Sequence, residues 1–334
     1  MWKMLARSQL ILLGAILASF LVSLCSDRFD PYFVDVTIGI GINIILAVSL
    51  NLINGFAGQF SLGHAGFMAV GAYSAAVVTT NLGRNLLPLA GGQTWILFPL
   101  ALLVGGVLAA LAGLLVGVPS LRLKGDYLAI VTLGFGEIIK VIFLNVDAVG
   151  AARGMIGIPQ YTNLFWTFSL AALTIYVVWA LVHSTYGRGF IAVNDDEVAA
   201  EAMGLNTTRY KITAFVVGAF FAGLAGGIYA HFKQFITPTG FDFNKSIEIV
   251  VMVILGGMGK NVGVILAAVL LTLLPECLRA VAGWTIPVPF RDQPLSLEWV
   301  RGARMILYSL LLLGLMLTRP QGLFVWPLWK RKAT

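Results

Sequence analysis

Long apolar segments separated by short polar ones repeat along the whole chain. Most are long enough for a helix to cross the ~30 Å hydrocarbon core of a bilayer. They are continuous, which favours helices over the short alternating strands of a membrane barrel. The ten segments are 8–26, 33–53, 64–82, 94–116, 127–146, 165–183, 212–232, 246–255, 262–282 and 302–318. We predict an all-α, polytopic transmembrane helix bundle that forms a single domain over residues 1–334.

The number of spans, 8 to 10, depends on two glycine-rich interruptions. These are NGFAGQFSLG at 54–63 and GGMGKNVG at 256–263. If either interruption is re-entrant, the count falls below ten. Segment 246–255 is too short to span unless it continues into the glycines. Segment 8–26 is followed by no small-residue cleavage site, so we expect a retained first helix instead of a signal peptide.

Composition supports a membrane protein. The chain is 59% hydrophobic and 11% charged, whereas soluble domains carry about 25% charged residues. The net charge of +7 comes from basic residues scattered over short loops without interleaved aromatics, which does not favour nucleic acid. With alternating spans, Lys and Arg are more numerous on the side that holds both termini and the loop at 187–211. This asymmetry predicts that side to be cytoplasmic.

The sequence contains no motif for chemistry of its own. There are three histidines and two cysteines without metal-type spacing, and no HExxH, GxSxG or GxxxxGKS pattern. We therefore expect no catalytic residue, no metal site, no bound cofactor and no ATP-binding motif. A proton-driven carrier usually carries more intramembrane carboxylates than Glu137 alone. The chain is not expected to be an enzyme, and its energy is expected to come from another protein.

The polar segment 187–211 is the main departure from the apolar pattern. It reads as a short helix at 195–203, with Asn194 as N-cap and Glu197 completing a capping box. Gly204 and Asn206 supply the stop signal. The alanines indicate a small-residue face on which another protein docks. The docking residues that we predict are Glu197, Ala199, Ala200, Glu201, Ala202 and Gly204.

The two glycine interruptions are also candidates for a solute path. Broken helices at membrane depth are tolerated where they are buried in protein or line a cavity. The alternatives are close helix packing by glycine or a simple loop. Glu137 and Lys140 lie at i and i+3 on one helix face, either as a functional pair or as a neutralised one. The predicted pathway residues are Gln59, Ser61, His64, Glu137, Gly256 and Gly257.

Several stretches resemble one family over about residues 38–324. They are NLINGFAGQFSLGHAGFMAVGAY, LRLKGDYLAIVTLGFGEIIK, GRGFIAVNDDEVAAEAMGLNTTRYK, VILGGMGKNVG and RPQGLF. They resemble the permeases of branched-chain amino acid (Leu/Ile/Val) ABC transporters, M-type subunit, and also the urea and short-chain amide relatives. The resemblance implies an importer half-channel in a bacterial inner membrane. It also implies a homologous second permease subunit, two cytoplasmic ATP-binding subunits that use ATP, and a periplasmic solute-binding protein.

The resemblance also assigns a role to the predicted docking helix. Importers of this kind insert an EAA-xxx-G helix into a groove of the ATPase, and Ala199, Ala200 and Gly204 fit that spacing. Val198 stands where the glutamate is expected, and Glu197 and Glu201 flank it; we expect these two to meet basic residues of the ATPase. The implied function is import of branched-chain or related hydrophobic amino acids. A urea or amide importer, a stand-alone channel or secondary carrier, and a membrane scaffold remain alternatives.

Overall fold

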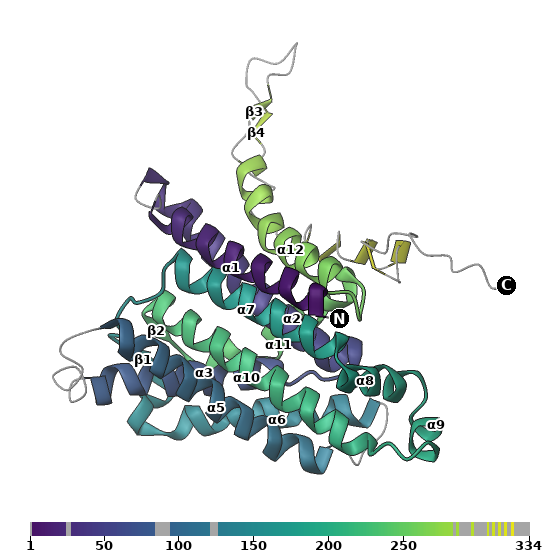
Figure 1. Cartoon of the computed structure of the whole chain (residues 1–334). Coiled ribbons are helices and arrows are strands. Elements are labelled where there is room, and N and C mark those ends of the chain that lie inside the picture. The colour runs from purple at the N-terminus through teal and green to yellow at the C-terminus, as the bar shows by residue number, and fades with distance from the viewer. Residues whose placement is uncertain are drawn as a thin grey trace.

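Helices dominate the computed structural model, which describes residues 2–24, 28–83, 94–120, 126–282 and short pieces between 285 and 323. Figure 1 shows these helices gathered into one bundle. The predicted all-α helix bundle is therefore confirmed. In chain order the α-helices are α1 (Trp2–Leu24), α2 (Pro31–Asn51), α3 (His64–Val77), α5 (Thr94–Ser120), α6 (Asp126–Asn145), α7 (Leu164–His183), α8 (Thr185–Asp195), α9 (Glu197–Ala202), α10 (Thr207–Lys233), α11 (Phe243–Gly256) and α12 (Asn261–Ala282).

Six helices of the described part are long and apolar enough to cross a membrane. They are Pro31–Phe56, Trp95–Ser120, Tyr127–Asn145, Leu164–His183, Thr207–Lys233 and Asn261–Ala280. α1 contributes a shorter apolar helix, Gln9–Leu24. α11 has 14 residues, which agrees with the expectation that this segment is too short to span by itself. The predicted segment 302–318 lies outside the described residues apart from short pieces.

Short irregular elements join or extend these helices. α2 continues into a π-helical turn, η2 (Leu52–Phe56), and α3 into a second one, η3 (Val78–Leu82). The 3₁₀ turns are η4 (Asp147–Val149), η5 (Ala151–Arg153) and η6 (Pro238–Phe241). The strands, which the hydrophobic pattern did not predict, have two residues each: β1 (Met155–Ile156), β2 (Phe235–Ile236), β3 (Thr285–Ile286) and β4 (Leu295–Ser296).

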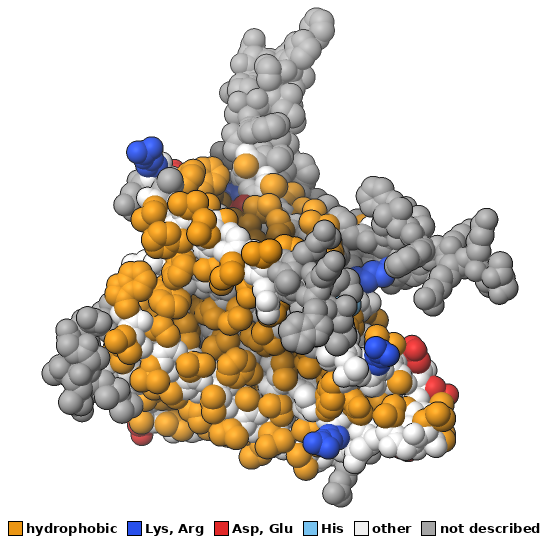
Figure 2. Space-filling view, viewed as in Figure 1, with side chains coloured by type: hydrophobic (Ala, Val, Ile, Leu, Met, Phe, Trp, Pro, Cys, Tyr) orange, Lys and Arg blue, Asp and Glu red, His pale blue; other side chains and the backbone are white. Residues whose placement is uncertain are grey.

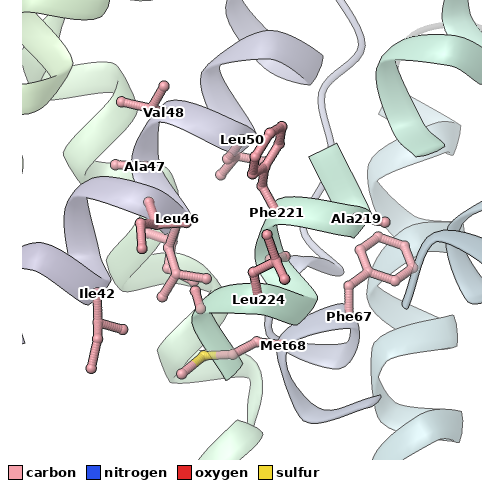
Figure 3. Close-up of a cluster of buried hydrophobic side chains, with 14 of the residues drawn as sticks. Ile42, Leu46, Ala47, Val48, Leu50, Phe67, Met68, Ala219, Phe221 and Leu224 are labelled. Carbon is pink, nitrogen blue, oxygen red and sulfur yellow. The ribbon is translucent and has the colours of Figure 1, made fainter. Parts of the chain in front are cut away.

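The centre of the bundle is formed by α3, α5 and α10, with α2 against α10. Figure 3 shows apolar side chains from α2, α3 and α10 meeting there, among them Leu46, Met68 and Leu224. Glycines bring the backbones close together. A Cβ atom on Gly226 would collide with the carbonyl oxygen of Met68 on α3. Small residues permit this close packing where lipid supplies no hydrophobic driving force between helices.

The remaining helices surround this centre. α2 also packs against α7, α11 and α12, while α1 packs on α7 and α6 packs on α3. Large apolar side chains stay exposed on the outer helices, including Leu115 on α5, Ile130 on α6 and Val262 on α12. Figure 2 shows hydrophobic side chains over most of the visible side of the bundle. Such a surface fits a hydrocarbon environment better than water.

The loops of the bundle divide between two ends. At one end β1 pairs antiparallel with β2, and Tyr161 stacks on His231 of α10 with ring centroids 5.9 Å apart. At the other end lie α8, α9, η2 and the turn after α11, which are joined by hydrogen bonds described below. This division agrees with alternating spans, because the loops predicted to share a side meet at the same end.

Candidate functional site

The polar segment 187–211, in which one short helix was predicted, contains most of α8, all of α9 and the start of α10. α8 begins after Ser184, whose Oγ accepts a hydrogen bond from Gly187 N (3.1 Å). It ends at Asp195, and α9 begins two residues later. Asp196 alone separates the two helices, and Figure 1 shows α9 at the tip of the pair, away from the bundle axis.

Asp196, and not Asn194, is the N-cap of α9. Its carboxylate accepts from Val198 N at 2.9 Å and from Ala199 N at 3.0 Å. Its own N–H donates to Ala192 O of α8, so the same residue closes one helix and opens the next. The predicted capping role of Asn194 is wrong, because α8 extends past that position.

Gly204 ends α9 as predicted. It has a φ of 82°, a left-handed conformation that glycine adopts at low cost. The N–H of Leu205 donates to Ala200 O at 3.0 Å, which closes the turn. Asn206 then caps the following helix, since its side chain accepts from Arg209 N at 3.0 Å. Only residues 203–206 therefore separate α9 from α10.

The two glutamates of α9 turn toward α10. Glu197 forms an ion pair with Lys211 Nζ at 2.7 Å, and the Lys211 side chain is only 3% exposed. Glu201 accepts a hydrogen bond from Thr207 Oγ1 at 2.8 Å. Both carboxylates are therefore occupied within the chain and hold α9 against α10. This differs from the expectation that they are directed at basic residues of a partner.

The free face of α9 is apolar. Val198 is 69% exposed and Met203 is 83% exposed. Ala199 and Ala202 are exposed beside them, whereas Ala200 is buried against the chain. The predicted alanines thus do not share one face, because Ala200 points inward. The surface that α9 offers to a partner consists of Val198, Ala199, Ala202 and Met203, which we call the α9 face.

The two glycine interruptions meet in space, although about 200 residues separate them in the sequence. Asn51, which is fully buried, accepts from Gly259 N and donates to Asn261 Oδ1, both at 2.9 Å. Gly55 lacks a side chain where Gly259 approaches, and a Cβ there would collide with Gly259 N. We call residues 51–61 and 257–261 together the glycine joint. Sequence reasoning singled out both segments but not their contact.

The first interruption leads back into the bundle. After η2 the chain has no regular secondary structure from 57 to 63, and α3 then begins at the fully buried His64. The N–H of Leu62 donates to Thr132 of α6 at 3.0 Å, and that of Ala65 to Ser246 of α11 at 3.2 Å. Because Thr132 lies inside α6 and Ser246 lies ten residues before the end of α11 at the joint, α3 starts within the bundle and not at its end. This is the geometry of a discontinuous membrane helix.

The predicted pathway residues fall into two groups. Gln59 and Ser61 lie in the segment before α3, where Ser61 is fully buried, and His64 begins α3 and hydrogen-bonds Ser49 Oγ through Nε2 at 2.9 Å. Gly256 ends α11, and Gly257 opens the turn that Lys260 N closes on Gly257 O.

Glu137 stands apart from these residues. It pairs with Lys140 on α6 at 2.6 Å, as the i, i+3 spacing predicted. No described contact joins it to the glycine joint. Within the described ranges, no group of three or more His, Cys, Asp or Glu side chains is placed to hold a metal ion.

Comparison with known proteins identifies the family. The family model for "Branched-chain amino acid transport system / permease component" matches residues 32–318. The LivM permease protein of Salmonella typhimurium is 35% identical over 330 residues, covering 87% of this chain and 69% of the relative. Escherichia coli LivM is likewise 35% identical, covering 84% and 67%. A probable LivM from Methanocaldococcus jannaschii is 24% identical, covering 85% and 90%.

More distant similarity extends to the autoinducer 2 import permease LsrC of Escherichia coli, 28% identical over 187 residues and covering 45% of this chain and 54% of the relative. No solved structure matches the chain significantly. The resemblance stated from the sequence motifs is confirmed by the family model and by the LivM relatives. With its apolar helices, the chain is a multi-pass membrane protein that belongs to the permease components of branched-chain amino acid transport systems.

Proposed function

We propose that the chain is a permease subunit of an ATP-driven importer that carries branched-chain or related hydrophobic amino acids inward across a bacterial inner membrane. The names of the LivM relatives support this substrate class. A homologous second permease subunit completes the path, and a periplasmic solute-binding protein delivers the solute. Two separate subunits hydrolyse ATP in the cytoplasm. The chain itself binds no nucleotide, and both of its termini are cytoplasmic.

The observation that carries the proposal is the α9 face. The two glutamates of α9 are paired on the side of the helix toward α10, and the opposite side presents Val198 and Met203 to solvent. Exposed apolar side chains on a short, rigid helix mark a protein contact. A methionine adapts to an irregular groove because its side chain is flexible and polarisable. We therefore place the ATPase contact on this face.

The charge distribution supports the orientation. Over the whole sequence, the loops on the side of α9, which include Arg188, Arg209 and Lys260, carry more Lys and Arg than the loops on the other side. Basic residues are enriched in the cytoplasmic loops of membrane proteins. In this orientation an ATPase reaches α9 from the cytoplasm.

The docking role is tested by co-purification of the ATPase subunits with the permease pair. We expect Met203→Asp and Val198→Asp each to weaken ATPase binding by about 30-fold, the effect of losing a central interface contact. Ile156→Asp is the matched control, because Ile156 is 75% exposed at the opposite end of the bundle. Binding that survives both α9 substitutions would place the ATPase elsewhere.

The substrate class is tested by uptake into proteoliposomes that contain the whole transporter and its binding protein. We expect labelled leucine, isoleucine and valine to accumulate in an ATP-dependent way. Labelled urea and acetamide are the comparison solutes. Accumulation of urea without leucine would assign the chain to the amide branch of importers. Accumulation of any of these solutes by the chain without ATPase subunits would indicate a channel or secondary carrier.

A further inference from the structure

One side chain connects the α8–α9 pair to the glycine joint. Asn194, near the end of α8, donates from Nδ2 to the carbonyl oxygen of Gly55 at 3.2 Å. Its Oδ1 covers Gly58, where an added Cβ would collide with it. Among the residues that the structure describes, no other hydrogen bond joins α8 or α9 to the joint. Asn194 is thus placed between the predicted ATPase contact and the interrupted helix.

A displacement of α9 reaches Asn194 without passing through a flexible linker. Asp196 is the only residue between the two helices, and it is bonded to both of them. α9 is also held to the start of α10 through the Glu197–Lys211 ion pair. Because α8, α9 and this turn of α10 are joined by polar contacts, a partner that moves the α9 face also moves the end of α8.

The glycine joint is not fully hydrogen-bonded in its present arrangement. Asn54 Nδ2 and Ser61 Oγ are buried and have no partner among the described residues of the chain, although Asn54 Oδ1 accepts from Ser61 N at 3.1 Å. Buried polar groups normally find partners, and leaving one unpaired is costly. The joint also contains the π-turn η2, an element frequent at functional sites. Because of these features, the free-energy difference between the present arrangement of the joint and a second arrangement is reduced.

A rearrangement of the joint would move two membrane helices. Residues 57–63 lead directly into α3. Through Asn51, the same joint holds Gly259 and Asn261 at the start of α12. The joint therefore controls the positions of two helix ends, one of them inside the bundle.

We propose that Asn194 is the positioning residue that transmits ATPase movement on α9 to the solute path. Its bond to Gly55 holds the joint in the arrangement seen here, and displacement of α9 withdraws Asn194 and releases the joint. Because this role presupposes ATPase docking on the α9 face, it deepens the proposed function.

The test uses the complete transporter in proteoliposomes, with solute uptake and ATP hydrolysis measured together. Asn194→Ala and Asn194→Asp both remove the donor to Gly55, and the aspartate keeps the shape of the side chain. We expect ATPase binding and hydrolysis to persist while uptake per ATP falls about tenfold, within the usual range of coupling between two sites. Asn206→Ala is the control, because Asn206 lies beyond α9 and caps α10 without touching the joint.

Two further variants test the same contact through residues of the joint. Gly58→Ala places a Cβ against Asn194, and it also strains a backbone with φ of 65°; we expect it to lower uptake per ATP in the same way. Ser61→Cys, in a background without Cys25 and Cys277, reports exposure of the buried joint to a thiol reagent. We expect its labelling rate to change about fivefold on ATP binding, and to be independent of ATP when Asn194→Ala is also present.

The outcomes separate the two levels of the proposal. If Asn194→Ala binds the ATPase subunits and keeps the uptake per ATP of the wild type, the role of Asn194 is overturned and α9 docking is left intact. An equal loss in Asn206→Ala would also overturn it, because the effect would then belong to the whole loop. A wild-type chain that binds no ATPase subunit would overturn both.

Discussion

Glycines serve different purposes in two regions of this bundle. Between α3, α5 and α10 they lie within continuous helices and let backbones touch, as at Gly226 and at Gly71 against Gly223. In the glycine joint they interrupt helices, and backbone groups near the interruptions bond to asparagine side chains such as Asn51 and Asn194. The first region is apolar and closely packed, whereas the second is polar and incompletely paired.

The difference indicates which part of the molecule is able to move. Close packing of small residues over several turns has one good arrangement, because any sliding produces collisions. A few hydrogen bonds across an interrupted helix are exchanged at lower cost, particularly where some donors and acceptors already lack partners. We therefore regard α3, α5 and α10 as a rigid scaffold and the joint as the place where the bundle rearranges. The substitutions below test this assignment, from the largest expected effect to the smallest.

The scaffold should not tolerate a side chain at its closest contact. Gly226→Val would drive its side chain into the carbonyl of Met68, and we expect a loss of more than about 4 kcal/mol, enough to prevent accumulation of folded protein. Gly134→Ala on α6 is the control, since a Cβ there meets nothing within 4 Å. Folded yield and thermal stability in detergent measure both. A fully folded Gly226→Val protein would contradict the rigid scaffold.

The joint should be weakened more locally. Asn51→Ala removes two hydrogen bonds and leaves Gly259 N and the Asn261 side chain without partners. We expect a destabilisation of about 3 kcal/mol, seen as faster hydrogen exchange at the start of α12 while α3, α5 and α10 stay protected. Asn51→Asp keeps an acceptor for Gly259 but buries a carboxylate without a counter-charge, so it should destabilise the joint at least as much. Uniformly faster exchange throughout the bundle would mean that joint and scaffold unfold together.

The attachment of α9 depends on a buried lysine. Glu197→Gln leaves Lys211 without its counter-charge, and we expect a cost of about 2 kcal/mol, below that of a fully buried pair because a quarter of Glu197 is exposed. Adding Lys211→Met should restore most of the stability, because the unpaired charge is then removed. Proteolysis of the segment between α8 and α10 measures the effect. No rescue by Lys211→Met would show that the loss has another origin than the unpaired charge.

The end of α9 should give the smallest change. Gly204→Ala meets no neighbouring atom but must adopt a φ of 82°, which costs about 1 kcal/mol for a residue with a side chain. We expect ATPase affinity to fall less than fivefold, with membrane insertion unchanged. The ATPase affinity of Gly204→Asn should lie between those of wild type and Gly204→Ala, since asparagine tolerates this conformation better than alanine. An equal loss for alanine and asparagine would argue against a conformational effect.

Much of the architecture was predictable from the apolar segments, because membrane-spanning helices satisfy their own backbone and need a minimum length. The short helix at 195–203 was predicted in roughly the correct place because its cap and stop residues are local signals. Its cap was assigned incorrectly, since Asn194, Asp195 and Asp196 all suit an N-cap. The choice depends on how far α8 extends, and the burial of Phe190 and Val193 accompanies that extension.

The contacts between distant segments were not predictable. The two glycine interruptions carry no sequence signal for pairing, and neither does the two-residue pairing of β1 with β2. The direction of the α9 glutamates depends on where α10 begins and so on the position of Lys211. Each of these is fixed by tertiary packing, to which local propensity and periodicity do not respond.

The most direct test of the account is ATP-dependent uptake of labelled leucine by proteoliposomes that contain the complete transporter, compared between wild type and Met203→Asp. The α9 face predicts that wild-type uptake requires ATP and that the substitution lowers it by at least about tenfold, with the permease pair still inserted. Uptake that persists without ATP, or that Met203→Asp leaves unchanged, would contradict it.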